Sequence, residues 1–339
     1  MAYVSCEKLQ EGSIYIVGQF SSNPQKFELA NNLFDPSLDN YANEHFHFPR
    51  LRDEIFKRTG LLLKTPEPGQ ESLTDANYVI VLNGNYNKYN LHMLSKEKLI
   101  LLITECPAVL AISWNGAYQD HFNKIFTWND DLVDSKKFFK YNRAVLSPMI
   151  KNTVDFDDKK LCTMMLNNKC PKANPKQLCT ERHGIINFFE SIQAKDFDFY
   201  GRGWDRKRYK NYKGSVGGPE NQYRGSKIET IKNYKFYICY ENMRDIKGYI
   251  TEKIFDCFAA GVVPIYWGAS NIEEFVDKGC FIDRKKFANN NDLYYFIKNM
   301  KKEEYENYLE NIRLYLISEK AQLFSFSYLV DCFVKGLKQ

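Results

Sequence analysis

The sequence predicts an α/β protein built from two Rossmann-like domains that face each other across a cleft. Its 339 residues exceed the roughly 250–300 residues at which a single hydrophobic core stops growing. Short apolar runs alternate with helical patterns in both halves, as in parallel sheets covered on both faces. A proline and a charged run separate the halves, so we expect domains at residues 1–150 and 151–339. The last helix is a candidate to pack back on the N-terminal domain.

Apolar runs in the first half predict five strands and one helix. The expected strands are 13–17, 61–64, 78–82, 98–104 and 124–128, and the expected helix is 51–58.

The second half repeats this alternation. The expected strands are 160–166, 197–200, 235–240 and 262–266, and the expected helices are 181–192, 251–260 and 303–316. Thr251 has the side chain of a helix cap, and Gly261 follows the helix end. In such sheets the ligand lies beyond the carboxyl ends of the strands.

Composition excludes some classes of protein. The chain has 47 Lys and Arg against 42 Asp and Glu, a balance too even to predict a nucleic-acid partner but compatible with a small anionic ligand. No stretch reaches the roughly 20 apolar residues of a membrane span. We therefore expect a cytoplasmic protein without a membrane anchor, of bacterial or viral origin. The sequence does not predict an oligomeric state.

The nine cysteines contain no CxxC pair, and several lie inside apolar runs. We expect reduced core residues in a reducing compartment. A disulfide among Cys162, Cys170 and Cys179 is the alternative.

The segment 234–267 carries most of the chemistry. A buried strand ends in Glu241 and Asn242, and a helix opens at Glu252 and Lys253. Unpaired N–H groups in a first helical turn carry partial positive charge, so a diphosphate can bind there, with Lys253 adding a full charge. Such a site needs no divalent metal.

Two neighbouring side chains have alternative roles. The carboxylate of Glu252 can accept hydrogen bonds from ribose or sugar hydroxyls, or it can simply favour the helix dipole. Tyr249 can line the same pocket or pack in the core.

Long motifs in this region resemble a known family. YKFYICYEN at 234–242, GYITEKIFDCFAAGVVPIYWGASNIEEF at 248–275 and FIDRKKF at 281–287 resemble the signature region of glycosyltransferase family 10, the α-1,3/4-fucosyltransferases. The similarity extends upstream to DFDFYGRGW at 196–204 and ERH at 181–183, and so covers most of residues 160–290. It implies a GT-B-like fold and an inverting transfer of L-fucose from GDP-fucose to a glycan, with no metal or other cofactor required.

The resemblance also assigns residues. The positions that match the donor-binding set are Arg182, Tyr200, Gly201, Asn242, Tyr249, Glu252 and Lys253. Arg182 matches the arginine that holds the diphosphate, although its spacing to the following phenylalanines differs from better-known members. An exposed arginine near a helix start is the alternative for this residue.

Glu105 is the candidate general base. It follows a buried strand in the sequence TECP, and the family places a glutamate at the corresponding strand end. A carboxylate there can take the proton of an acceptor hydroxyl as the sugar C1 is attacked from the face opposite the leaving GDP. The alternative is a glutamate that bonds loop amides before a proline.

Three other motifs are not assigned to function. Asp196 and Asp198 have the DxD form of metal sites, but the motif runs into a strand, which favours a structural role. His45 and His47 lack a third ligand for a metal. The basic, aromatic run 206–213 has the pattern of single-stranded nucleic-acid binding, yet it fits a loop near the cleft better. We therefore expect no metal and no nucleic acid.

Three functions remain open from the sequence. The first is a fucosyltransferase that uses GDP-fucose. The second is a transferase on the same scaffold with another donor, such as UDP-xylose or a different GDP-sugar, because a helix-terminus phosphate site does not select base or sugar. The third is a non-catalytic carbohydrate- or nucleic-acid-binding protein. The acceptor is not predicted.

Overall fold

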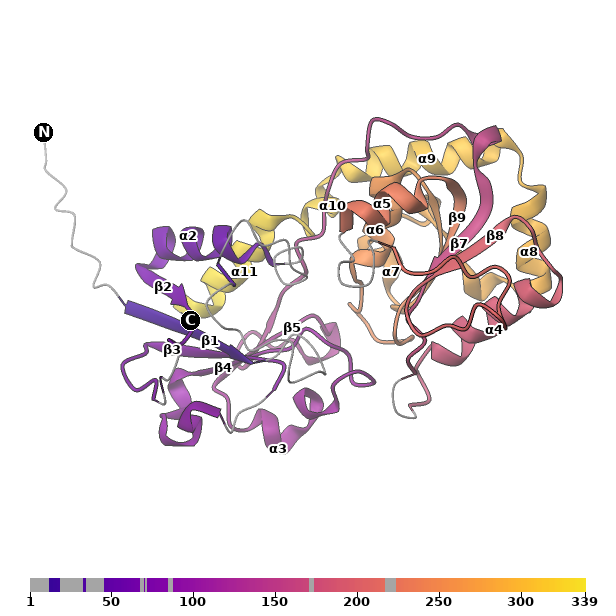
Figure 1. Ribbon diagram of the computed structural model, residues 1–339. Coiled ribbons are helices and arrows are strands. Elements are labelled where there is room, and N and C mark those ends of the chain that lie inside the picture. The colour runs from indigo at the N-terminus through magenta and orange to yellow at the C-terminus, as the bar shows by residue number, and fades with distance from the viewer. Residues whose placement is uncertain are drawn as a thin grey trace, which may run out of the picture. The chain divides into compact units, whose positions relative to one another are not determined.

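The computed structural model describes residues 12–18, 33–34, 46–67, 70, 72–84, 88–170, 174–216 and 224–339. They belong to two compact units (Figure 1). The first comprises the described residues of Met1–Ala144 and of Phe326–Gln339, and the second comprises those of Val145–Ser325.

The first unit is built on a sheet of six strands in the order β2-β1-β3-β4-β5-β6, all paired in parallel. The strands are β1 Gly12–Gly18, β2 Leu61–Lys64, β3 Tyr78–Leu82, β4 Leu99–Leu102, β5 Lys124–Thr127 and β6 Phe138–Lys140. The described helices are α2 Phe48–Thr59, α3 Gly116–Gln119 and α11 Phe326–Lys338. All four residues of β4 are buried, as expected for an inner strand covered on both faces.

Helix α11 completes the core of this first unit although it comes last in the chain. Phe333 stacks on Phe126 with ring centroids 4.6 Å apart. Lys124 Nζ donates to the carbonyl oxygen of Gly336 at 2.8 Å. An ion pair of 2.6 Å joins Arg58 of α2 to Asp331. The final helix is thus an integral part of the N-terminal unit.

The division between the units lies between Ala144 and Val145, six residues before the expected position after residue 150. The backbone N–H groups of Val145 and Leu146 donate to Phe324, and that of Ile150 donates to Ala259. These bonds attach the segment to the second unit.

The second unit contains five parallel strands in the order β11-β10-β9-β7-β8. They are β7 Lys160–Met165, β8 Phe197–Tyr200, β9 Tyr234–Tyr240, β10 Val263–Trp267 and β11 Ile282–Asp283. Its helices are α4 Cys179–Ser191, α5 Arg224–Ile231, α6 Glu252–Ala260, α7 Ile272–Phe275, α8 Asn290–Asn299, α9 Lys302–Leu316 and α10 Glu319–Gln322. Each unit is an α/β domain around a parallel sheet, which confirms the predicted fold class.

Central strand β9 and helix α6 position the candidate site. Six of the seven residues of β9 are buried, and its chain continues through a loop to α6. The Thr251 side chain caps α6 at its start, and Gly261 ends it in the left-handed conformation. The amino end of α6 is therefore fixed beside the carboxyl end of the sheet.

The structure bears out the alternative of a disulfide: Cys170 and Cys179 are linked with their Cα atoms 5.6 Å apart, so the expectation of reduced cysteines is wrong for these two. Helix α4 begins at Cys179, and this fold brings its first residue to Cys170, a proximity that sequence spacing does not reveal. Five cysteines are free and buried, and Cys332 is free and half-buried. Cys6 lies outside the described residues.

No helix in the described part of the chain combines the length and the apolar character that a bilayer span needs.

Candidate functional site

A buried carboxylate joins the end of β9 to the start of α6. Glu241 directly follows β9 and has no exposed surface. Its oxygens accept hydrogen bonds from the Thr251 backbone N–H at 2.8 Å and from the Thr251 hydroxyl at 2.8 and 2.9 Å. Lys253 Nζ donates to the same carboxylate at 3.1 Å. The position of the Lys253 ammonium is thus set by a charge that the sheet itself supplies.

Lys253 stays charged in this environment. Burial alone would lower the pKa of Lys253, but the carboxylates of Glu241 and Glu252 raise it above its ordinary value. Its Nζ also donates to the Thr251 hydroxyl at 3.0 Å and lies 3.6 Å from Glu252 Oε1. A fixed cation at a helix amino end adds to the partial positive charge of the first-turn N–H groups.

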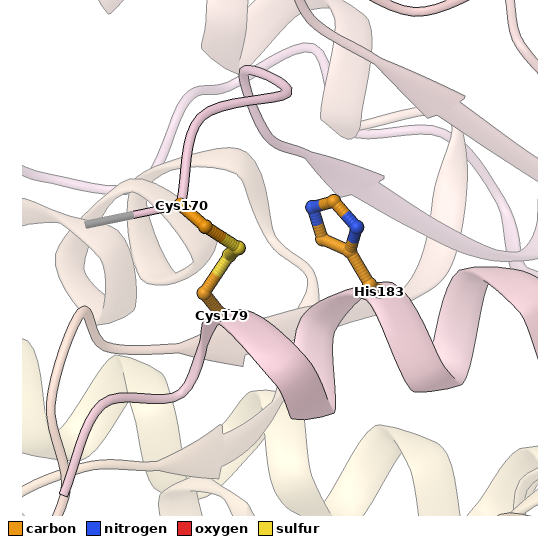
Figure 2. A group of neighbouring side chains, drawn as sticks. All are labelled: Cys170, Cys179 and His183. Atoms are coloured by element: carbon orange, nitrogen blue, oxygen red, sulfur yellow. A yellow bond between two sulfur atoms is a disulfide. The ribbon is translucent and has the colours of Figure 1, made fainter. Parts of the chain in front are cut away.

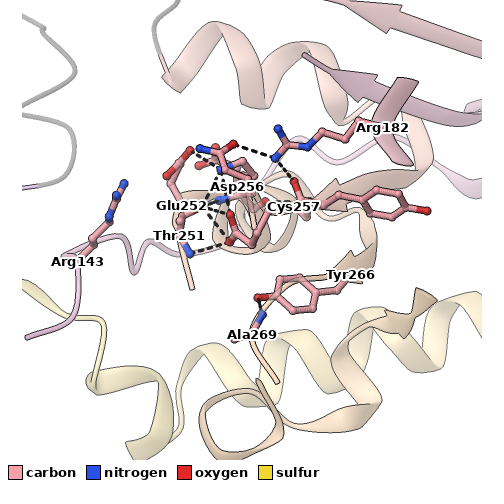
Figure 3. Close-up of polar contacts among 12 residues, drawn as sticks. Arg143, Arg182, Thr251, Glu252, Asp256, Cys257, Tyr266 and Ala269 are labelled. Atoms are coloured by element: carbon pink, nitrogen blue, oxygen red, sulfur yellow. Dashed lines mark hydrogen bonds and ion pairs between the residues drawn. The ribbon is translucent and has the colours of Figure 1, made fainter. Parts of the chain in front are cut away.

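Arg182, in the first turns of α4, contributes a second cation at the same strand end. It is buried, and its Nη2 donates to the Tyr240 carbonyl oxygen at 2.6 Å and to Asn242 Oδ1 at 3.0 Å. The start of α4 is held there because the Leu178 N–H donates to the Asn242 carbonyl. Figure 3 shows Arg182, Thr251 and Glu252 in this arrangement.

Two further predicted residues belong to the same loop and helix. Glu252 is the first residue of α6 and is half-buried. Tyr249 is only 2% exposed, so its ring is packed inside the domain. Four of the predicted donor-binding residues, Arg182, Asn242, Glu252 and Lys253, thus gather where β9 ends and α6 begins.

Tyr200 and Gly201 lie at the end of β8. The Tyr200 hydroxyl shares a hydrogen bond of 2.8 Å with that of Tyr234. Tyr234 is the first residue of β9, whereas Asn242 lies beyond its last residue, so the structure does not group the Tyr200 hydroxyl with the cations. Gly201 has a φ of 143° and donates to the Gly214 carbonyl. The glycine-rich sequence of 214–218 predicts a mobile segment that could close over the donor, and residues 217 and 218 lie outside the described residues.

Glu105 belongs to the first unit, three residues beyond the end of β4, and is half-buried. Its backbone is held at both ends: its N–H donates to Asn83 Oδ1 at 3.1 Å, and its carbonyl oxygen accepts from Trp114 Nε1 at 3.0 Å. Asn83 also accepts from the Thr104 N–H at 2.7 Å. The side chain of Asn83 therefore fixes the strand end that carries the candidate base.

Comparison with protein families decides the classification of this chain. Residues 159–328, half of the chain, match the model described as glycosyltransferase family 10 (fucosyltransferase), C-terminal part. The chain belongs to glycosyltransferase family 10. The match covers β7 to β11 and the cation cluster, which consists of Arg182, Asn242, Glu252 and Lys253.

Curated relatives of this family 10 chain are similar over short segments. An alpha-(1,4)-fucosyltransferase of Arabidopsis thaliana is 39% identical over 70 residues, which are 21% of this chain and 17% of that protein. The alpha-(1,3)-fucosyltransferase FucT of Helicobacter pylori is 34% identical over 73 residues, 22% of this chain and 15% of that protein. The chain thus spans well under two thirds of the length of either relative.

A solved structure extends the likeness to the whole family 10 chain. The α1,3-fucosyltransferase with GDP-fucose has a TM-score of 0.53 and 14% identity, and the match covers 100% of this chain and 94% of that one. At this identity the comparison shows the shared two-domain GT-B fold.

Sequence reasoning missed two features of this family 10 site. The sequence predicts Glu241 only as a polar strand end, although a carboxylate that closes an apolar run is a signal for a buried ion pair. Sequence reasoning also missed Trp267, which ends β10 with the guanidinium of Arg284 5.5 Å and that of Arg244 5.9 Å from its ring centroid. These three side chains add cationic and aromatic surface at the carboxyl ends of the strands.

The DxD motif has a structural role in this family 10 chain. Asp198 is buried, and its carboxylate pairs with Lys160 at 2.7 Å and with Lys213 at 3.1 Å. It also accepts from the Tyr234 hydroxyl. Lys160 and Tyr234 open strands β7 and β9, and Lys213 comes from the basic run 206–213, so the motif ties that run to the sheet.

Proposed function

We propose that this chain is an inverting glycosyltransferase that transfers L-fucose from GDP-fucose to a hydroxyl group of a glycan acceptor. The observation that carries the proposal is the pair of cations, Arg182 and Lys253, held at the amino end of α6 by Asn242 and the buried Glu241. Membership of glycosyltransferase family 10 supports the choice of reaction.

The cations act on the leaving group. As the bond between fucose and diphosphate breaks, negative charge develops on the diphosphate, and Lys253, Arg182 and the α6 dipole stabilise that charge. Because these groups are already fixed by their partners, they need little reorganisation. In this mechanism no metal is required.

The remaining donor-binding residues orient the substrate. Asn242 and Glu252 provide hydrogen-bonding groups for ribose and sugar hydroxyls, whereas Tyr249, only 2% exposed, is packed inside the domain. Tyr200 and Gly201, at the end of β8, are the other two positions that match the family's donor-binding set, although the Tyr200 hydroxyl bonds Tyr234 and lies apart from the cations. Glu105 takes the proton of the acceptor hydroxyl while the sugar passes through an oxocarbenium-like transition state.

Ligand-induced thermal stabilisation tests the donor. GDP, GDP-fucose, other GDP-sugars, UDP and UDP-sugars are compared, each with and without EDTA. We expect the largest increase in Tm with GDP-fucose and no effect of EDTA; at a ligand concentration of 100 Kd the gain is about 2.7 kcal/mol. A preference for a UDP-sugar would replace the donor, and sensitivity to EDTA would contradict the metal-free mechanism.

The thermal-stability series, combined with a filter-binding assay, distinguishes a transferase from a nucleic-acid-binding protein. A chain that no nucleotide stabilises, and that binds oligonucleotides tightly and with steep salt dependence in a filter assay, would contradict the transferase.

Glu105→Gln tests the general base. The substitution keeps the size and removes the proton acceptor, so fucose transfer to an oligosaccharide panel should fall at least about 100-fold. GDP-fucose should still raise the Tm. The control is Glu97→Gln, an exposed glutamate just before β4, which should transfer at the normal rate. Normal turnover in Glu105→Gln would remove this residue from the role.

A further inference from the structure

Three side chains with metal-binding atoms meet at the start of α4, outside the cation cluster. The sulfur atoms of Cys170 and Cys179 and a ring nitrogen of His183 all lie within 4.8 Å of one another. Figure 2 shows the imidazole and the sulfur pair turned toward each other. Cys179 and His183 are four residues apart in one helix, so they share a face of it.

The histidine is suited to bind a cation. Its Nε2 is buried and has no hydrogen-bond partner within the part of the chain that the structure describes. Burial lowers the pKa of His183, and the positive charges of Arg182 and Arg208 lower it further. The imidazole is therefore neutral near pH 7, which is the form that binds metals.

The sulfur atoms are linked in the structure, but the link is accessible. Cys170 is exposed, whereas Cys179 is buried. A thiol or phosphine reductant can therefore attack from the Cys170 side. Two thiolates bound to one tetrahedral zinc ion at about 2.3 Å lie about 3.8 Å apart. Their separation must therefore grow by under about 2 Å from the disulfide distance.

We propose that reduction of the Cys170–Cys179 disulfide converts this cluster into a two-cysteine, one-histidine site for a thiophilic divalent cation such as Zn²⁺. The reductant supplies two electrons and is itself oxidised, the S–S bond breaks, and the two sulfur atoms take up two protons from solvent to form thiols. The cation then binds both sulfur atoms as thiolates, two protons leave to solvent, and His183 Nε2 donates its lone pair. A water molecule takes the fourth position.

The two states exclude each other, because the same sulfur atoms cannot form the disulfide and bind the cation as thiolates. The disulfide joins two residues that are nine positions apart in sequence, and the cation would join the same two residues. Each state joins the segment after β7 to the first turn of α4.

Cobalt binding tests the site. The intact chain is reduced with a phosphine, freed of reductant without oxygen, and titrated with Co²⁺ alone. We expect one Co²⁺ per chain, with sulfur-to-cobalt charge-transfer absorption and the visible bands of tetrahedral Co²⁺, all abolished when Zn²⁺ is added. The oxidised chain should give none of these bands. A reduced chain without charge-transfer absorption would overturn the proposal.

Variants identify the ligands. Cys170→Ser and His183→Gln should each weaken Co²⁺ binding at least tenfold, whereas Cys332→Ser, which changes a half-buried cysteine of the other unit, should bind as the reduced wild type does. Cys170→Ser is compared with reduced wild type, since both lack the crosslink. Circular dichroism confirms that each variant is folded. Unchanged Co²⁺ affinity in either ligand variant would overturn the proposal.

Discussion

Glu241 holds a negative charge without any exposed surface, and that charge depends on Thr251 and Lys253 for its hydrogen bonds. Removing one partner of a buried ion pair is far more destabilising than removing a surface charge, because the remaining charge has lost its compensation. The residues proposed to bind a diphosphate therefore also stabilise the folded domain.

Lys253→Met should lower the free energy of unfolding by about 3–5 kcal/mol and abolish stabilisation by GDP. Denaturant unfolding, with and without GDP, measures both effects. Adding Glu241→Gln to this variant should restore part of the stability but not the response to GDP. Lys278→Met removes an exposed lysine of the same domain and should change stability by less than about 0.5 kcal/mol. Equal stabilities of Lys253→Met and Lys278→Met would contradict a stabilising ion pair between Lys253 and the buried Glu241.

His183 should make stability depend on pH. Because its folded pKa lies below its ordinary value, the unfolded chain takes up the proton first as the pH falls. The contribution is present above about pH 6.5 and is lost as the pH falls through the folded pKa. Between pH 7.5 and 5.5, His183→Gln with the disulfide intact should therefore lose less stability than the wild type. An equal loss of stability in the wild type and in His183→Gln would contradict the lowered pKa of His183.

At this scale the sequence predicted the residues but not their partnerships. Asn242, Glu252 and Lys253 could be predicted because a strand end and a helix start can be recognised from local sequence. The bond from Arg182 to Asn242 joins residues 60 apart in sequence, and the contact of Cys170 with Cys179 depends on where α4 begins. Such contacts follow from the packing of elements, which local patterns do not contain.

Two glycines show how backbone conformation limits individual elements. Gly201, after β8, has a φ of 143°, and a Cβ atom there would collide with the carbonyl oxygen of Leu166. Gly184 lies inside α4, where a methyl group would meet nothing within 4 Å. The same substitution should therefore have opposite effects at these two positions.

Gly201→Ala should destabilise the protein by more than about 1 kcal/mol because both the backbone and the close contact resist a side chain. Gly184→Ala should stabilise it by about 0.5–1 kcal/mol, since alanine favours a helix interior. Denaturant midpoints measure both changes. A Gly201→Ala protein as stable as Gly184→Ala would contradict the described turn.

Element prediction succeeded where the signal was continuous. Strands β2, β3 and β8 have the expected bounds. The apolar residues of β2 and β3 form continuous runs, and β8 alternates aromatic residues with Asp198 before Gly201 ends it. Strands β6 and β11 have three and two residues, too few to show a period. Helices α5 and α8 were not predicted either: α5 has a weak apolar face, and α8 begins among asparagines.

At the scale of the molecule, the two units have separate cores. One hydrophobic cluster includes Val79, Leu101 and Ile125 of the first unit, and another includes Ile238, Phe255 and Ile265 of the second. The packing of α11 against the first sheet therefore stabilises the first unit and not the second.

Phe333→Ala should reveal this separation. Loss of a buried phenylalanine costs about 3–5 kcal/mol, so hydrogen exchange should accelerate in β4 and β5 while β9 keeps its protection. Exchange monitored by mass spectrometry gives both values in one experiment. Phe296→Ala, on α8 and 42% exposed, is the control and should leave β4 and β5 unchanged. Equal acceleration in β9 would show that the units open together.

The place of α11 in the first unit has a consequence during synthesis. Strands β1 to β6 leave the ribosome before any residue from Phe326 onward has been translated, so the unit that begins first is completed last. Domains usually fold as units in the order in which they emerge. Here Phe126 and Lys124 must wait for their partners in α11 until the second unit has been made. Until then the nascent first unit exposes the apolar surface that α11 later covers, and this surface is a binding site for a chaperone.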